Sequence, residues 1–234
     1  MKIVSKLLVL SWLFSGLAVV HAEVLVGNLG QAAMANASTT MSYSAKYAQK
    51  FTTGNLNLGD ADMNGLVSHK FSWALEPART GYDPVLDDYP LAENTYFEWS
   101  LLSDVGGSPG TDLIGATIFT ISSPGVASDS YNGSYGSFVL QSNSSYWLSI
   151  RFRSASGNTG ISSFPNLPVT SGSSVYGAGS LGGLMVNTGT GWGEVSGRAL
   201  IEIEAESVPE PTSLQLLGFS LGSLWILRGR RRKV

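Results

Sequence analysis

The chain has 234 residues, no cysteine and a formal net charge of −3. Without cysteine, a disulfide framework, a thiolate nucleophile and a thiolate metal site are excluded, and the length fits one domain of ordinary size. The charge is uneven: residues 1–22 and 208–234 hold seven of the 14 basic residues but only one of the 17 acidic residues, so the middle of the chain carries about −9. Such an acidic body argues against nucleic acid as a partner, because phosphate contacts need Lys and Arg.

The N-terminus has the pattern of a secretory signal peptide. Lys2 and Lys6 form a basic start, residues 7–20 are apolar, and Val20-His21-Ala22 ends the segment. This pattern predicts a signal peptide over residues 1–22, with signal peptidase cutting between Ala22 and Glu23. An uncleaved N-terminal anchor is the alternative. The sequence therefore predicts an exported chain.

Residues 23–70 predict short strands and loops, with one segment that resembles half of a calcium loop. Asp60, Asp62 and Asn64 alternate before Gly65, which is the ligand spacing of such a loop. The twelfth position is Phe71, where a calcium loop has a carboxylate. A polar turn is the favoured interpretation and a calcium site the alternative. We expect no metal or other cofactor in this protein.

From residue 71 onward, large apolar residues recur at every second position, which predicts half-buried strands. Clusters of Gly, Ser and Pro, such as residues 106–110 and 122–125, predict the turns between them. The Gly- and Ser-rich residues 154–198 predict long loops, with a partly disordered region as the alternative. We expect an all-β fold, a single jelly-roll-like β-sandwich over residues 23–207. The alternating segments are residues 71–75, 97–101, 146–153 and 199–206, with 113–121 and 138–141 as further strand candidates.

The C-terminus combines a proline motif, an apolar segment and a basic end. Leu214 to Leu227 carries no charge and, at roughly 1.5 Å per residue, makes a helix of about 21 Å, short for a hydrocarbon core of about 30 Å. We predict a marginal transmembrane helix over residues 213–228. Pro209 and Pro211 favour an extended backbone before it. The basic residues after it are expected to stay on the cytoplasmic side.

Residues 208–234 closely resemble the PEP-CTERM sorting signal of Gram-negative bacteria that make exopolysaccharide. The resemblance implies recognition and cleavage by an exosortase, a membrane-embedded processing enzyme, at Pro209, Glu210 and Pro211. It also implies passage through the inner membrane to the cell surface or to the extracellular matrix of a biofilm. The residues that would retain the tail in the membrane are Arg228, Arg230, Arg231, Arg232 and Lys233.

Residues 51–152 have a second resemblance, to the choice-of-anchor type domains that often precede such tails. It is carried by Phe-Thr-Thr-Gly at 51–54, by residues 99–104 with Ser-Pro-Gly at 108–110, and by residues 145–148. Residues 78–94 are an insertion in that pattern. The resemblance implies a β-rich module and no assigned activity.

The sequence contains few residues for catalysis, and we predict no catalytic residue. His69 is the one histidine of the exported body. The Gly-x-Ser-x-Gly matches at residues 106–110 and 218–222 fall in a predicted turn and in the apolar tail, so neither is the strand-to-helix elbow of a Ser-His-Asp triad. We expect His69 to be a surface or hydrogen-bonded residue. Glycosidases need only two carboxylates, which leaves an acidic segment, although a solvated loop is the favoured interpretation. Its acids are Asp83, Asp87, Asp88 and Glu93.

Two tryptophans are the candidate ligand contacts. Trp147 lies on the polar phase of its predicted strand and Trp192 lies among glycines. Flat aromatic rings beside polar groups suit sugar stacking, although packing under a loop is the favoured interpretation for Trp147. Three functions stay open. The first is a non-enzymatic structural or adhesive protein linked to exopolysaccharide, the second a carbohydrate-binding module, and the third a glycan-cleaving enzyme.

Overall fold

The computed structural model describes residues 22–31, 38–55, 67–81, 83–85, 87–132, 138, 140–156, 161–172 and 175–207. Their regular structure consists of strands, which confirms the all-β prediction for this part of the chain. It contains no helix that is long and apolar enough to cross a membrane. The predicted signal peptide before Ala22, the calcium-like segment at 60–65 and the sorting tail from 208 onward lie outside the described residues.

A four-stranded sheet contains the most regular alternation of the sequence. Phe71, Trp73 and Leu75 are buried on one face, as the period-two pattern predicts, and Ile201 and Ile203 are buried beside them. The first and last strands pair antiparallel, with Ala22 opposite Glu206. The strand order is β1 (Ala22–Gly27), β16 (Ile201–Ser207), β4 (Val67–Leu75) and β9 (Gly125–Asn132).

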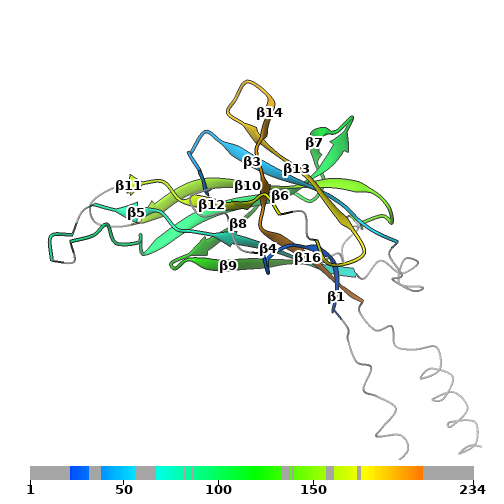
Figure 1. Cartoon of the computed structure of the whole chain (residues 1–234), viewed down its shortest axis with the longest axis horizontal. Helices are drawn as coiled ribbons and strands as arrows, with labels where there is room; N and C mark the ends of the chain where they lie inside the picture. Colours follow the sequence, from blue (N-terminus) through cyan, green and yellow to red (C-terminus); the bar gives the residue numbers. More distant parts are fainter. Residues whose placement is uncertain are drawn as a thin grey trace, which may run out of the picture. The chain divides into compact units, whose positions relative to one another are not determined.

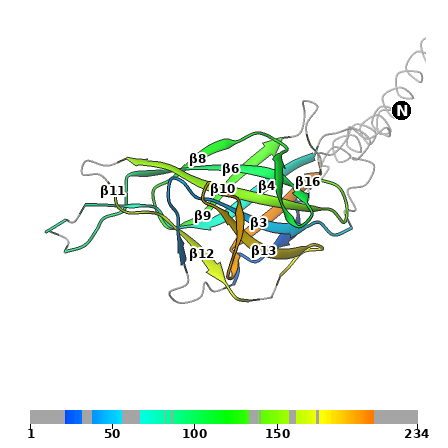
Figure 2. The same ribbon diagram turned by 90° about the horizontal axis from the view of Figure 1, so that it is seen from above.

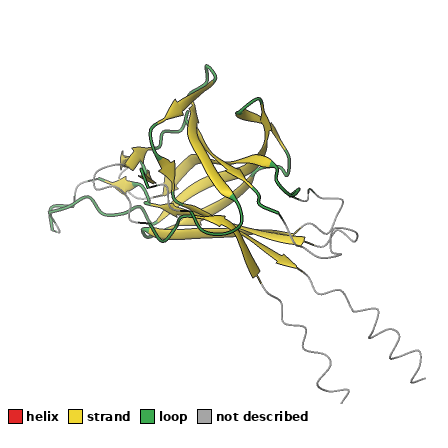
Figure 3. Cartoon of the chain, turned by 45° about the vertical axis from the view of Figure 1, so that its right-hand side comes forward, coloured by secondary structure: helices red, strands yellow, loops and turns green. Residues whose placement is uncertain are grey.

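A seven-stranded sheet carries the longest strands of the chain. Its order is β14 (Trp192–Val195), β13 (Ser180–Asn187), β3 (Lys46–Thr52), β10 (Ser145–Ser156), β6 (Asn94–Val105) and β7 (Ser108–Asp112), and β8 (Thr117–Ile121) also pairs with β6. The sheet is curled. In Figures 1 and 3 the β13–β14 hairpin and the β6–β7 hairpin rise on its two sides, away from the four-stranded sheet.

One hydrophobic core joins the two sheets. The ring of Phe71 on β4 lies 4.8 Å from the ring of Trp99 on β6, so side chains of both sheets meet directly. Burial of these apolar surfaces is the main stabilising contribution to such a fold. Other members of the same cluster are Val26, Phe51, Trp73, Phe97, Leu148, Ile150, Phe152, Ile201 and Ile203.

Two small ladders complete the β structure. β11 (Ile161–Ser163) pairs with β5 (Arg79–Thr80), and β12 (Asn166–Thr170) lies between β15 (Arg198–Ala199) and β2 (Ser38–Thr40). Figure 1 places β5 and β11 at the end of the β body opposite to β1 and β16, and Figure 2 shows β11 and β16 at opposite ends.

Several local predictions were wrong. Residues 154–198, predicted as loops, contain the strands β11 to β14. The glycines hide the alternation of β13, whose register against β3 shifts between Leu181 and Leu184. The buried Gln49 side chain donates to the Gly182 carbonyl at 2.9 Å, which holds this irregular segment in the sheet. Phe138 and Leu140 lie in no strand. The turn at 106–110 is limited to Gly106 and Gly107, and β7 begins at Ser108.

Candidate functional site

The two tryptophans singled out by the sequence lie on the same face of the curled sheet, around one small cluster. Trp147 on β10 lies on the face turned away from the main core, with Lys50 of β3 on one side and Leu102 of β6 on the other. Trp192 and Met185, from β14 and β13, pack against the small cluster that Trp147 forms with its neighbours. We call this surface the Trp147 face; it comprises Ala48, Lys50, Leu102, Asp104, Trp147, Met185 and Trp192.

The Trp147 side chain is buried in this face. It is 1% exposed, and its indole Nε1 donates to Asp104 Oδ1 at 2.6 Å. Lys50 Nζ lies 3.0 Å from the same carboxylate and 5.6 Å from the centre of the Trp147 ring. The indole therefore has its polar atom paired and its ring covered, which is the packing interpretation rather than sugar stacking. Trp192 is only partly buried.

The predicted half-burial of β6 and β10 does not hold at their centres, since both faces are covered. Ser100 and Ser149 are buried on the same side as Trp147, and their hydroxyls lie 2.8 Å apart. Lys46 donates to Ser100 Oγ at 3.1 Å, and burial lowers the pKa of Lys46, opposed by the charge of Asp112. Further along, Arg153 pairs with Glu98. This side of the sheet thus pairs its polar groups with one another.

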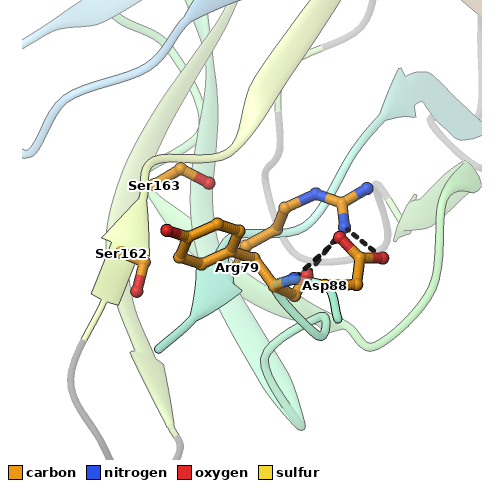
Figure 4. A pocket seen from close by; sticks show the side chains of 5 residues that line it. Arg79, Asp88, Ser162 and Ser163 are labelled. Carbon is orange, nitrogen blue, oxygen red and sulfur yellow. Dashed lines mark hydrogen bonds and ion pairs between the residues drawn. The ribbon is translucent and has the colours of Figure 1, made fainter. Parts of the chain in front are cut away.

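A second region has residue types similar to those of the Trp147 face but is exposed to solvent. Arg79, Asp88, Tyr89, Ser162 and Ser163 line a hollow of about 370 Å³, which we call the Tyr89 hollow. Arg79 and Asp88 face each other on one side, and Ser162 and Ser163 lie on the other (Figure 4). The hollow forms because β11 pairs Ser163 with Arg79 of β5.

The segment between β5 and β6 supplies the rest of the Tyr89 hollow by folding back on itself. The Asp83 amide donates to the Asp88 carbonyl at 2.8 Å, and the Ala92 amide donates to the Ala78 carbonyl at 2.8 Å. Asp87 has a φ of 51° at the return of this turn, a conformation that Asp tolerates better than most residues. The described residues of the predicted acidic loop therefore form a hydrogen-bonded turn.

The charged side chains at the rim of the Tyr89 hollow are largely exposed and form a long ion pair. Arg79 Nη1 donates to the Tyr89 carbonyl at 2.7 Å and lies 3.7 Å from Asp88 Oδ2. The Asp88 Oδ1 atom accepts the Tyr89 amide proton at 2.7 Å. The Arg79 and Asp88 side chains are 46% and 65% exposed, and Tyr89 is 47% exposed. A flat ring, hydroxyls, a guanidinium and a carboxylate are thus offered to solvent together.

The carboxylate pair needed by a glycosidase is not assembled in the Tyr89 hollow. Among the described residues that line it, Asp88 is the one acid, and the charged group opposite it is Arg79. Asp83 Oδ1 accepts the Val85 amide proton at 2.8 Å, so this carboxylate stabilises the turn. Asp87 and Glu93 are exposed and do not line the hollow.

His69 differs from its prediction. It continues the buried phase of β4 and is 1% exposed, and its Nε2 atom has no hydrogen-bond partner among the described residues. Burial lowers the pKa of His69 from 6.5 to about 4, so the side chain is neutral at pH 7. No group of three or more His, Asp or Glu side chains in the described part of the chain is placed to hold a metal ion.

The residues of the predicted processing sites are mostly beyond the described chain. Ala22 and Glu23 are the exception, since both pair with β16 as the first residues of β1. The sorting residues Pro209, Glu210 and Pro211 and the basic cluster after them lie outside the described residues. Comparison with known proteins adds no relative: no protein-family model, no curated protein and no solved structure matches the chain.

Proposed function

We propose that this chain is an exported, non-enzymatic structural or adhesive protein of the cell surface or extracellular matrix, linked to exopolysaccharide. The observation that carries the proposal is the order of parts in residues 208–234: proline motif, short apolar segment, basic end. In this proposal signal peptidase cuts between Ala22 and Glu23. The helix at 213–228 then holds the chain in the inner membrane until an exosortase-like enzyme acts at Pro209, Glu210 and Pro211.

The geometry of the β body supports a display role. Because Glu23, the first residue of the proposed mature chain, pairs with Ala205, the body begins and ends at neighbouring positions. A membrane tether attached before β1 or after β16 therefore holds the β body from the same side. The opposite end, where β5 and β11 lie, is then available to a partner (Figure 1).

We also propose that the two main sheets form a single jelly-roll-like β-sandwich. Their shared core supports this, since Phe71 and Trp73 of one sheet belong to the same cluster as Trp99 and Ile150 of the other. The strand order also supports it, because β1 pairs with β16 and β4 pairs with β9, so the chain crosses repeatedly between the sheets. Such crossings are typical of Greek-key and jelly-roll folds.

The sorting proposal is tested by intact-mass analysis of the inner membrane, the outer envelope and the medium of an exosortase-containing Gram-negative host. The expected product outside the inner membrane begins at Glu23 and lacks Arg230 to Lys233. A variant that combines Pro209→Ala with Pro211→Ala is expected to accumulate uncleaved, whereas Pro124→Ala, an exposed proline in a body loop, is the matched control. A product that retains the basic cluster in every fraction contradicts the proposal.

A further inference from the structure

Exposed aromatic side chains gather around β11. Tyr89 lines the hollow with Ser162 and Ser163, and Phe164 follows Ser163 directly in the chain. Phe164 is 37% exposed, and its ring lies 5.4 Å from the ring of Tyr43, which is 43% exposed. A second aromatic surface is thus continuous in sequence with the wall of the Tyr89 hollow.

The Tyr43–Phe164 pair is held on a rigid base. Tyr43 stacks on the fully buried Phe152 at 4.6 Å, and Phe164 meets Phe152 edge-on at 6.0 Å. Arg151 Nε donates to the Tyr43 carbonyl at 3.1 Å, which also holds the Tyr43 backbone. Rings held in this way lose little conformational entropy when a ligand stacks on them.

The chemistry around these rings is that of a saccharide site. A sugar ring presents an apolar C–H face and a rim of hydroxyls, and it needs a flat apolar surface beside donors and acceptors. The Tyr89 ring supplies the surface, and the Ser162 and Ser163 hydroxyls supply both donors and acceptors. The hollow, at about 370 Å³, is near the small end of ligand sites, which span roughly 300–1,000 Å³.

The local charge selects the kind of saccharide. Asp88 lies in the Tyr89 hollow, and the same segment carries Asp83, Asp87 and Glu93, against the single cation Arg79. A chain rich in carboxylates or sulfates meets repulsion from these acids and from the acidic body. A neutral saccharide meets none.

We infer that the Tyr89 hollow and the Tyr43–Phe164 pair together bind a neutral polysaccharide chain. The inference deepens the proposed function by naming the partner's chemistry and the surface that meets it, and it rests on that function for the exported location. It assigns ligand contact to Tyr89, Phe164 and Tyr43 in place of Trp147 and Trp192. The strands β5 and β11, which carry Arg79, Ser162 and Ser163 of the hollow, lie at the end of the β body opposite to β1 and β16 (Figure 1).

The test is affinity gel electrophoresis of the full chain in detergent, with dextran, galactomannan or xylan as neutral probes and alginate or polygalacturonate as acidic ones. We expect at least one neutral probe to retard the protein and neither acidic probe to do so. Tyr89→Ala and Phe164→Ala are each expected to weaken apparent affinity about five- to tenfold, the range for losing one aromatic contact. Tyr89→Phe keeps the ring and is expected to keep most of the binding.

Two further variants keep the test decisive. Ser162→Glu adds a charge at an exposed position of the Tyr89 hollow and is expected to abolish retardation without changing the melting temperature. Trp192→Ala alters the Trp147 face instead and is expected to bind like the wild type. The inference is overturned if no neutral probe retards the wild type, if only acidic probes do, or if Ser162→Glu binds normally. Because the unprocessed chain is used, these outcomes are independent of sorting.

Discussion

The Trp147 face and the Tyr89 hollow are built from the same kinds of residue and differ in exposure. Each has an aromatic side chain, a cation and an aspartate. In the first, Lys50 lies 3.0 Å from Asp104 and the tryptophan is 1% exposed. In the second, Arg79 lies 3.7 Å from Asp88 and the tyrosine is 47% exposed. The same combination therefore stabilises the sheet where it is closed and is available to a ligand where it is open.

The difference comes from what lies beside each group. The Trp147 face is at the centre of the curled sheet, where Met185 and Trp192 of the β13–β14 hairpin pack against the cluster of Ala48, Leu102 and Trp147. The Tyr89 hollow lies on a two-stranded ladder at one end of the body, with a turn on one side and two serines on the other. Neighbouring strands exclude water from the first region, and nothing among the described residues does so in the second.

Removing the aromatic ring from each region in turn is expected to give the largest difference in stability between the two regions. Trp147→Ala creates a cavity and leaves Asp104 without its indole donor, and the free energy of unfolding should fall by about 3–5 kcal/mol. Tyr89→Ala removes an exposed ring and should change it by less than about 0.5 kcal/mol. Urea unfolding of both variants measures the difference. Equal losses would show that the two regions are equally structural.

The two regions must be compared at one constant pH, because protonation of His69 changes the free energy of unfolding by itself. Its pKa is 6.5 in the unfolded chain and about 4 in the fold, so between these values the unfolded chain binds a proton that the folded chain does not. Its contribution to stability is complete above pH 6.5 and is lost as the pH falls to 4, by about 3 kcal/mol. Urea unfolding of His69→Phe across this range should lack that component. An unchanged slope would contradict the burial of His69.

The two aspartates are expected to differ in the same direction as the rings. Asp104→Asn weakens a short, charge-assisted hydrogen bond to a buried indole and removes the partner of Lys50, which should cost about 1–3 kcal/mol. Asp88→Asn alters a long, exposed ion pair and should cost less than about 0.5 kcal/mol. Thermal unfolding at pH 7.5 compares them. A larger loss for Asp88→Asn would reverse the assignment of roles.

Replacing Lys50 and Arg79, the cations of the two regions, should give the smallest difference in stability. Lys50→Met keeps an aliphatic side chain and removes the partly buried charge that lies over the Trp147 ring, for an expected loss of about 1 kcal/mol in the free energy of unfolding. Arg79→Met should be close to neutral for stability and should still lower neutral-glycan retardation. Parallel melting and gel experiments separate the two effects. Loss of stability without loss of binding in Arg79→Met would make this cation structural.

Much of the β structure was predictable because its cause is local. Phe71, Trp73 and Leu75, and likewise Ile201 and Ile203, alternate in sequence and are buried on one side of their strands. β13 was missed, because Gly182 and Gly183 interrupt its alternation and its pairing depends on the distant Gln49. The hollow was missed for a similar reason: Arg79 and Ser163 are far apart in the chain and meet only through β5 and β11.

By itself, the sequence determined which residues form the core face of each regular strand, the acidic charge of the body and the lack of cysteine. Its targeting segments stay predictions. Only the tertiary structure decided which aromatic side chains outside the main core are closed off, burying Trp147 on its strand and leaving Tyr89 exposed in its turn. A period-two pattern specifies two faces of a strand, but strands and loops distant in sequence determine whether the second face meets water. That long-range choice separates a structural tryptophan from a ligand-facing tyrosine.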